Sequence, residues 1–496
     1  MYIFVLISLK YSISVCFCSI GAHDTWGIAF GTQSNTSTAK MVESPNFKRI
    51  SHQTSPLDIF SKIYKKYKTV YLLESIEGPR RLAQFSFIGF DPRVTVLVKD
   101  GIAILHNNEN HDETKKAVAD PLEAVKEAIS GRSTANKDFR FAGGAVGFIS
   151  YDAVRYWEKL PCKTSDDLGF PDVEMGIFDD GIVFDHKQKR AYYYYYSLNR
   201  LPEVEDAIRQ TTEREALTYG HPTSNVGKER FEEAVDEARE YIKQGDIFQA
   251  VLSKRYTFGF KGDLTKFYKE LRAINPSPYM YFYKSGSRQI VGSSPEMLTR
   301  TESRTVETFP IAGTRPASRN SKENRRFAKE LLKDPKEQAE HVMLVDLARN
   351  DVGKVAKFGS VRVPEFMHVH RYSHVQHIVS RVIGDLRDDC DSFSALKAVF
   401  PAGTVSGAPK VRAMEIIEEL EPTRRGPYAG AVGYFSYNGN SDFAITIRTL
   451  FADNSQACIQ AGAGIVADSV PEHEWLETEH KAGALMKALQ ACGGER

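Results

Sequence analysis

Strand-like and helix-like segments alternate along most of the chain, and this alternation restricts its fold more than any other feature. Residues 70–73, 94–98 and 102–105 are short apolar runs typical of strands. Residues 231–242 place apolar side chains at helical spacing, and Gly245 follows as a stop. Several strands are interpreted as antiparallel, and no repeat of fixed period is present. The pattern therefore predicts an α+β fold rather than a regular βαβ array.

The charges of the chain are almost balanced. Lys and Arg number 65 and Asp and Glu number 64, so the formal net charge is +1. A protein that binds nucleic acid through a broad electrostatic field needs a basic excess, and this chain has none. Hydrophobic residues make up 42% and charged residues 26%, which disfavours a disordered chain or a simple coiled coil. We therefore expect a globular protein without a nucleic-acid partner.

The six cysteines are scattered, and the sequence contains no Cys-x-x-Cys pair. Structural zinc, a redox dithiol and a dense disulfide framework are disfavoured for this reason. A reduced, cytoplasmic setting is expected.

Residues 1–40 differ from the rest. The apolar runs 2–9 and 11–22 are separated by Lys10 and lack the basic start of a signal peptide, and residues 32–40 are polar and of low complexity. Our preferred interpretation places residues 1–40 outside the fold, as a disordered extension or the product of an upstream start codon, with export as the alternative. No other segment can span a membrane, so no membrane partner is expected.

A length of 496 residues suggests about three domain-sized units or one large fold. Residues 198–227 mix charged residues with prolines and a glycine, which is typical of a connection. We expect an N-terminal region at 41–225 and a C-terminal region at 226–496, sharing one continuous fold.

A pair of glutamates follows a predicted helix start near the middle of the chain. Asp334 suits the cap of this helix and Pro335 its first position. Glu337 and Glu340 then fall on one face. Glu337 can be explained by its position in the first turn, where it would cap the helix and complement the helix dipole. Capping does not explain Glu340.

A second pair lies on a helix that Pro471 is expected to open. Glu474, Glu477 and Lys481 form one stripe of this helix. The plain alternative is a solvated face with a Glu477–Lys481 ion pair worth ~0.3–0.5 kcal/mol. Each Glu-x-x-Glu alone is weak evidence. Two such helices, in a chain without histidine–cysteine clusters, predict a hard-cation site suited to Mg²⁺.

Glycine-rich segments and one arginine indicate a place for an anionic ligand. Residues 401–410 superficially resemble a nucleotide-binding loop but lack its spacing, and they lead into a predicted helix whose exposed N–H groups would attract a carboxylate. Residues 462–464, Gly-Ala-Gly, allow close approach of backbone to a ligand. Arg448 can clamp a carboxylate with two hydrogen bonds, although an arginine at a strand end more often forms a surface ion pair.

Four long motifs occur together: PIAGTR at 310–315, AEHVMLVDLARND at 339–351, PAGTVSGAPKVRAM at 401–414 and DFAITIR at 442–448. With them the chain resembles the chorismate-utilising enzymes, and most closely the large subunit, component I, of the anthranilate synthases. The resemblance runs from about residue 45 to the C-terminus. It implies large antiparallel β-sheets packed as a sandwich with helices on the outer faces.

The resemblance also implies roles for residues at the matching positions. The expected metal ligands are Glu340 and Glu477, with Glu337 and Glu474 in supporting, water-mediated roles. The expected chorismate-binding residues are Gly313, Thr314, Tyr434, Arg448, Gly462, Ala463 and Gly464. The expected catalytic residues are His377, Thr404 and Glu340. We hypothesise that His377 is the general acid for the departing hydroxyl, the alternative being a packed core histidine.

The implied activity is the Mg²⁺-dependent conversion of chorismate and ammonia to anthranilate and pyruvate, the first step of tryptophan biosynthesis. No glutaminase motif is present, so the implied partner is a glutamine amidotransferase subunit, component II, in a heterotetramer. Segments 72–75 and 275–280 imply feedback inhibition by tryptophan, the alternative being a strand end and a proline turn. The residues expected around the inhibitor are Ser75, Pro278, Tyr279 and Met280.

Two positions separate this chain from related activities. Relatives that add water to chorismate carry a lysine where this chain has Gln249. Aminodeoxychorismate synthases typically carry a lysine, able to form a covalent adduct, where it has Ala312. Both differences favour anthranilate as the product. The alternatives that stay open are component I of a 4-amino-4-deoxychorismate synthase and a non-catalytic subunit that binds tryptophan or chorismate.

Overall fold

The computed structural model describes residues 41–50, 55–76, 84–136, 138–210, 216–318, 320–372 and 375–493. The expected extension at 1–40 lies outside these residues. The chain from Lys40 onward forms one compact unit. None of the helices in the described ranges combines the length and the apolar character needed to cross a membrane.

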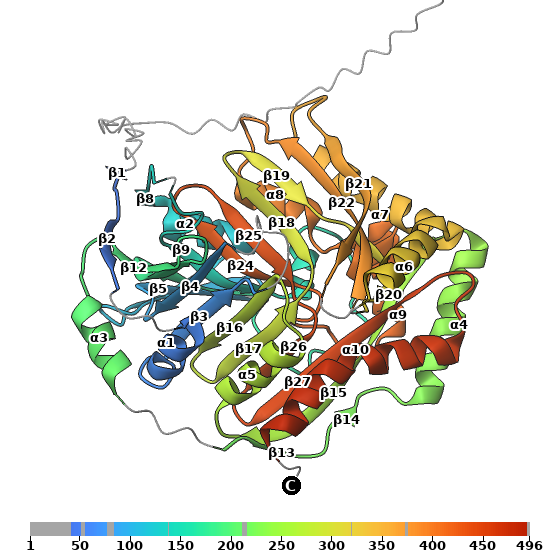
Figure 1. The fold of residues 1–496 in the computed structure, drawn as a ribbon, viewed down its shortest axis with the longest axis horizontal. Helices are drawn as coiled ribbons and strands as arrows, with labels where there is room; N and C mark the ends of the chain where they lie inside the picture. The colour runs from blue at the N-terminus through green and yellow to red at the C-terminus, as the bar shows by residue number, and fades with distance from the viewer. Residues whose placement is uncertain are drawn as a thin grey trace, which may run out of the picture. The chain divides into compact units, whose positions relative to one another are not determined.

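Two large sheets, antiparallel at every recorded strand pair, form the centre of this unit (Figure 1). The 12-stranded sheet contains, in spatial order, β20 (Ile311–Pro316), β22 (Val375–Asp385), β19 (Thr305–Thr308), β18 (Met297–Glu302), β25 (Ser441–Ile445), β24 (Ala431–Ser436), β9 (Gly144–Ile149), β10 (Val173–Phe178), β5 (Val94–Lys99), β6 (Ile102–Asn107) and β7 (Glu113–Ala117), with β21 (Arg362–Arg371) beside β22.

The 13-stranded sheet contains, in spatial order, β13 (Thr218–Tyr219), β15 (Gln249–Lys261), β27 (Gln456–Ile465), β26 (Thr449–Asp453), β17 (Arg288–Ser294), β16 (Tyr279–Ser285), β3 (Thr69–Glu74), β4 (Phe85–Phe90), β11 (Asp180–Asp185), β12 (Arg190–Tyr195) and β2 (Asn46–Arg49), with β14 (Thr223–Ser224) and β23 (Gly407–Ala408) beside β15. The short strands β1 (Met41–Val42) and β8 (Arg132–Ser133) pair separately. Both large sheets take strands from 41–225 and from 226–496, so the two regions are interleaved.

Alternate side chains of the 13-stranded sheet face two different cores, as the period of a strand requires. In β16, Tyr281 and Tyr283 join the core shared with the other sheet, whereas Met280 and Phe282 join a core with helices. Aromatic rings bridge the sheets, since the Tyr283 and Phe148 ring centroids lie 6.1 Å apart. The two sheets therefore pack as a sandwich.

Helices cover the outer faces of the sandwich (Figure 1). The helices are α1 (Pro56–Ile63), α2 (Pro121–Ser130), α3 (Leu201–Arg209), α4 (Lys228–Gln244), α5 (Leu264–Ile274), α6 (Ser321–Lys333), α7 (Pro335–Gly353), α8 (Ser392–Val399), α9 (Lys410–Leu420) and α10 (Pro471–Cys492), with 3₁₀ turns η1 (Tyr151–Tyr156) and η2 (Gly403–Val405). α1, α5 and α10 pack on the 13-stranded sheet, and α2, α7 and α8 on the other. The predicted α+β sandwich with outer helices is confirmed.

Local sequence explains where several of these helices begin and end. The Asp334 side chain accepts hydrogen bonds from the N–H groups of Lys336 and Glu337 at the start of α7, as the cap prediction requires. Gly245 ends α4 in the left-handed conformation, with φ of 87°.

The alternating run 443–450 does not form one strand. The chain leaves the 12-stranded sheet after β25 and enters the 13-stranded sheet at β26. Arg448 lies at this crossing with a φ of 50°, which a continuous strand does not permit. The crossing carries the Arg448 side chain from one layer towards the other.

Candidate active site

Two glutamate-bearing helices supply the acidic side of the site. Burial raises the pKa of Glu340 in α7, and the negative charges of Glu337 and of Glu477 from α10 raise it further. Gln249 Nε2 donates to Glu340 Oε1 at 3.4 Å. The structure therefore brings Glu340 and Glu477, which are far apart in sequence, within electrostatic reach of each other.

The remaining two glutamates lie at the edges of this acidic group. Glu337 accepts a hydrogen bond from Arg315 at 2.8 Å instead of closing a capping box. Burial raises the pKa of Glu474. Glu477 is half-exposed and pairs with Lys481 at 2.7 Å, the ion pair that the plain alternative required. Lys481 Nζ also donates to the carbonyl of Gly462 at 3.0 Å, so this lysine links α10 to β27.

The carboxylates of Glu340 and Glu477 are possible ligands of a metal ion. The described residues contain no group of three or more His, Cys, Asp or Glu side chains arranged to hold a metal. A site built from Glu340 and Glu477 alone still fits Mg²⁺, which keeps several waters and takes other oxygens from its substrate. Burial and, after it, the charges of Glu337 and Glu477 raise the pKa of Glu340, so a cation would stabilise its ionised form.

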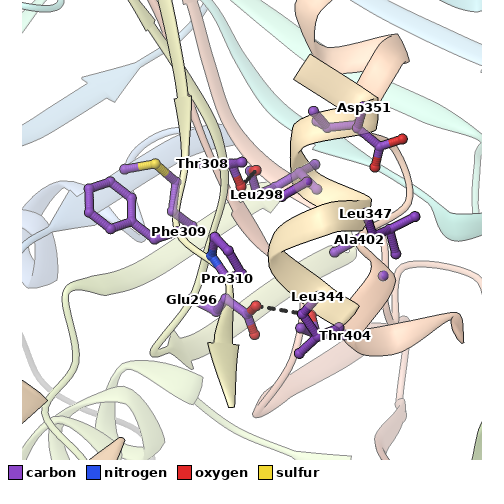
Figure 2. A pocket seen from close by; sticks show the side chains of 14 residues that line it. Glu296, Leu298, Thr308, Phe309, Pro310, Leu344, Leu347, Asp351, Ala402 and Thr404 are labelled. Atoms are coloured by element: carbon purple, nitrogen blue, oxygen red, sulfur yellow. Dashed lines mark hydrogen bonds between the residues drawn. The ribbon is translucent and has the colours of Figure 1, made fainter. Parts of the chain in front are cut away.

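A buried carboxyl group that the sequence motifs did not indicate lies beside these residues. Glu296, between β17 and β18, is 8% exposed and accepts a hydrogen bond from Thr404 Oγ1 at 3.0 Å (Figure 2). Burial raises the pKa of Glu296 to about 8, although the charges of Arg448 and Lys481 act against this rise. Glu296 is therefore protonated at neutral pH. A single acidic residue within the apolar stretch 290–298 was the available signal.

His377 lies in β22 against the loop of the PIAGTR motif. Its Nδ1 lies 2.8 Å from the Gly313 carbonyl, so Nδ1–H donates, and the Thr314 hydroxyl lies 3.2 Å from the same nitrogen. Burial lowers the pKa of His377, and Arg448 lowers it further. The ring is thus neutral, with Nε2 left as an acceptor. The structure brings Gly313, Thr314 and His377 together near Arg448.

The Gly-Ala-Gly segment at 462–464 lies in β27, paired with β15. A Cβ atom on Gly462 would lie 2.7 Å from the hydroxyl of Tyr428, and one on Gly464 would lie 2.6 Å from Nε2 of Gln249. Both glycines are therefore required for these close approaches. The buried Tyr428 was not identified from sequence. The chain has 23 tyrosines, and no motif considered there distinguishes Tyr428 from the others.

Tyr434 lies apart from this group. Its side chain lines a cavity with Ser75, Tyr279 and Met280, the residues expected around tryptophan. The Tyr434 ring packs on Phe141 with centroids 4.8 Å apart. The structure thus places Tyr434 with the expected feedback residues instead of with Arg448. Pro278 precedes β16 and is not among the residues that line this cavity.

The predicted site residues therefore fall into two groups. The first contains the two glutamate helices, the PIAGTR loop with His377, Thr404, Arg448 and the glycines of β27. The second contains Ser75, Tyr279, Met280 and Tyr434. Glu296, Tyr428 and Lys481 complete the first group, and sequence reasoning had given none of these three a role in binding or catalysis.

Comparison with known proteins shows which family has this sequence and fold. A family model described as chorismate binding enzyme matches residues 47–487. Anthranilate synthase component 1 of Methanothermobacter marburgensis is 47% identical over 452 residues, 91% of this chain and 96% of the relative. Aminodeoxychorismate synthase component 1 of Bacillus subtilis is 43% identical over 463 residues, 90% of this chain and 97% of the relative.

A solved structure agrees with the sequence comparisons. The crystal structure of anthranilate synthase component I from Streptococcus pneumoniae superposes with a TM-score of 0.73 at 36% identity, covering 88% of this chain and 99% of that one. The matched range takes in both glutamate helices, the PIAGTR loop and Arg448. The chain belongs to the family of chorismate binding enzymes.

Proposed function

We propose that this protein is component 1 of an anthranilate synthase and converts chorismate and ammonia to anthranilate, pyruvate and water. One observation carries the proposal: half-buried Glu340 lies within electrostatic reach of Glu477, and Lys481, the partner of Glu477, lies within electrostatic reach of the buried, protonated Glu296 near Arg448. Chorismate has two carboxylates and a hydroxyl that must leave, so such a site matches its charges. The Methanothermobacter and Streptococcus relatives support the same reading.

Substrate binding follows from charge and backbone geometry. Arg448 would take one carboxylate with two hydrogen bonds, which burial strengthens. The backbone of Gly313 and of the β27 glycines would approach the ring closely, and the Tyr428 hydroxyl, 2.7 Å from a Cβ position on Gly462, would border the same space.

Glu340 and Glu477 would hold Mg²⁺, with Glu337 and Glu474 acting through water. The ion would neutralise and orient the second carboxylate of the substrate. Lys481 compensates the charge of Glu477 in its absence. Glu340 has no recorded ion pair, and the charge of Lys336 is the smallest of the influences on its pKa, so Glu340 is the side chain that would depend most on the ion.

Glu296 is the better proton donor for the reaction. Ammonia forms a C–N bond at C2 as the C4–O bond breaks, and the departing oxygen needs a proton to leave as water. A carboxyl with a pKa of about 8 holds that proton at neutral pH, whereas the lowered pKa of His377 leaves its imidazole unprotonated. Elimination of pyruvate and loss of the C2 proton then give the aromatic ring. His377 Nε2 is placed as an acceptor in these later steps.

Ammonia would come from glutamine through a separate amidotransferase subunit, because the relatives are named as components. The four described cysteines are free thiols, which is compatible with a cytoplasmic protein. The second candidate activity is 4-amino-4-deoxychorismate synthesis, favoured by the Bacillus subtilis relative at 43% identity. Ala312, which cannot form a covalent adduct with the substrate, argues for anthranilate.

Tryptophan would inhibit through the cavity of Ser75, Tyr279, Met280 and Tyr434. This cavity has room of only about 40 Å³ for water-sized molecules, so tryptophan must displace side chains to enter. Ser75→Leu should leave kcat unchanged and raise the tryptophan concentration for half-inhibition at least about tenfold, because the new side chain fills the cavity. Equal inhibition of both proteins, measured by anthranilate fluorescence, would place the feedback site elsewhere.

The activity itself is tested directly. Purified protein is mixed with chorismate, ammonium and Mg²⁺, and anthranilate fluorescence is followed with and without EDTA. Mg²⁺-dependent anthranilate formation supports the proposal. Chorismate consumption that yields an unaromatised amino product instead identifies an aminodeoxychorismate synthase, and no consumption identifies a non-catalytic binding subunit.

A further inference from the structure

A small cavity extends from the Glu296–Thr404 hydrogen bond along one face of α7. Figure 2 shows Glu296 and Thr404 at one end, Asp351 at the other, and Leu298, Leu344 and Leu347 between them. The four positions 340, 344, 347 and 351 fall on one stripe of the helix. α7 therefore carries the metal-binding carboxylate, the cavity wall and Asp351 in sequence along about 16 Å of its length.

The size of the cavity decides what it can hold. Its room for water-sized molecules is about 40 Å³, and each such molecule needs about 10–15 Å³, so about three fit. A chorismate ring does not fit. Ammonia, which has nearly the size of water, does.

Apolar side chains outnumber polar ones in the wall of the cavity, whose polar members are Glu296, Thr308, Asp351 and Thr404. Leu298, Phe309, Leu344, Leu347 and Ala402 are among the residues that form it. A cation in such surroundings loses its hydration without gaining a partner, which costs far more than the transfer of a neutral molecule. Ammonium is the major form at neutral pH, but only uncharged ammonia has the lone pair that attacks carbon. An apolar passage therefore selects the reactive form.

The far end of the cavity offers no free negative charge to hold ammonium. Asp351 Oδ2 pairs with Lys410 Nζ at 2.6 Å, and Asp351 Oδ1 pairs with Lys354 Nζ at 3.0 Å. Lys410 also donates to the carbonyl of Val399 at 2.9 Å, so the lysine is fixed in place. One carboxylate between two lysines does not attract a third cation.

We infer that this cavity is the entry route of the second substrate: neutral ammonia passes along α7 between Leu298, Leu347 and Ala402 and reaches the reacting carbon from the Glu296–Thr404 end. The inference rests on the proposed function, because it requires an amine-consuming reaction at Glu296.

The first test narrows the cavity. Ala348→Met places a larger side chain in the cavity wall, and Ala339→Met makes the same change at an exposed position of α7 as the control. Ala348→Met should raise the KM for ammonium about tenfold, while kcat and the KM for chorismate change less than about twofold. Ala339→Met should resemble the parent. An unchanged ammonium KM, or an equal rise for both substrates, overturns the route.

The second test widens the cavity and stays informative should Ala348→Met fail to fold. Leu347→Ala removes an apolar side chain from the wall, with Leu332→Ala at the exposed end of α6 as the control. Methylamine is supplied in place of ammonium, and N-methylanthranilate is measured by mass spectrometry. Leu347→Ala should raise the ratio of methylamine to ammonia use about tenfold. An unchanged ratio overturns the route.

The two proposals fail in different ways. A parent protein that forms no amino product from chorismate and ammonium refutes the proposed function. A parent that does, with variants that leave both the ammonium KM and the amine selectivity unchanged, refutes only the entry route.

Discussion

Buried carboxylates of the scaffold and of the site differ in their partners. In the scaffold, Glu421 accepts two hydrogen bonds from Arg425, at 2.9 and 2.7 Å, and Asp442 accepts two from Arg300, at 2.9 and 2.6 Å. In the site, Glu340 has only an amide at 3.4 Å. Glu296 has only a hydroxyl at 3.0 Å. The two scaffold acids are thus paired with arginine, whereas Glu340 and Glu296 of the site form no recorded ion pair.

The largest effect is expected where a scaffold pair is broken. Arg425→Met leaves Glu421 buried without its counter-charge and should lower the free energy of unfolding by about 3–5 kcal/mol in urea denaturation. Arg412→Met, which breaks a half-exposed pair with Asp246, should lower it by less than about 1 kcal/mol. Equal losses in the two variants would remove the contrast between buried and surface pairs.

Removal of the acid in the site should act on catalysis instead of stability. Glu296→Gln keeps the shape and an acceptor for Thr404 but has no acidic proton, so kcat should fall about 10²–10³-fold with an unchanged chorismate KM. His377→Gln is the comparison, and it should lower kcat less. A larger loss in His377→Gln would return the role of proton donor to the histidine.

Glu340, which forms no recorded ion pair, should control metal binding. Glu340→Gln should weaken Mg²⁺ binding at least about tenfold by titration calorimetry, because an amide cannot match a carboxylate as a ligand. The same change removes a repelled, buried charge and should raise the Tm of the metal-free protein. Glu472→Gln, an exposed change in α10, should alter neither quantity. Unchanged Mg²⁺ affinity in Glu340→Gln would separate this residue from the metal.

The last contrast is a pH dependence of stability. Burial raises the pKa of Glu296 in the folded protein to about 8, from the ordinary glutamate value of 4.5. Between these values the unfolded chain releases a proton that the folded chain keeps, so rising pH favours unfolding. The Tm of the parent should therefore fall relative to that of Glu296→Gln between pH 5 and pH 8. Parallel Tm curves for the two proteins would mean that Glu296 titrates normally.

Local structure could be predicted from sequence where a few neighbouring residues determine it. The cap at Asp334 and the stop at Gly245 needed only short-range sterics and hydrogen bonds. The order of strands within the two sheets could not be predicted, because pairs such as β3 with β16 join residues more than 200 positions apart. The break at Arg448 was missed because alternation alone does not reveal that a chain changes sheets.

The site was predicted in part for the same reason. The glutamate pairs carried a visible period, the long motifs contain Gly313 and Arg448, and the family resemblance indicated His377 outside them. Glu296 has no periodic partner, and its role depends on burial, which no local pattern encodes. The identity of the site tyrosine depends on which side of the sandwich a side chain faces, so Tyr434 was named and Tyr428 was overlooked.

The crossing between the two layers has a mechanical consequence. β25, which supplies Asp442 and Ala444 to the Ser75 cavity, runs directly into the segment that holds Arg448. The opposite wall of that cavity belongs to the other layer, through β3 and β16. A molecule bound there would shift one layer against the other, and Arg448, proposed here to bind a substrate carboxylate, lies on the segment that joins the two layers. Tryptophan bound in the Ser75 cavity would then act on Arg448 directly, because Arg448 lies on the segment that connects the two sheets.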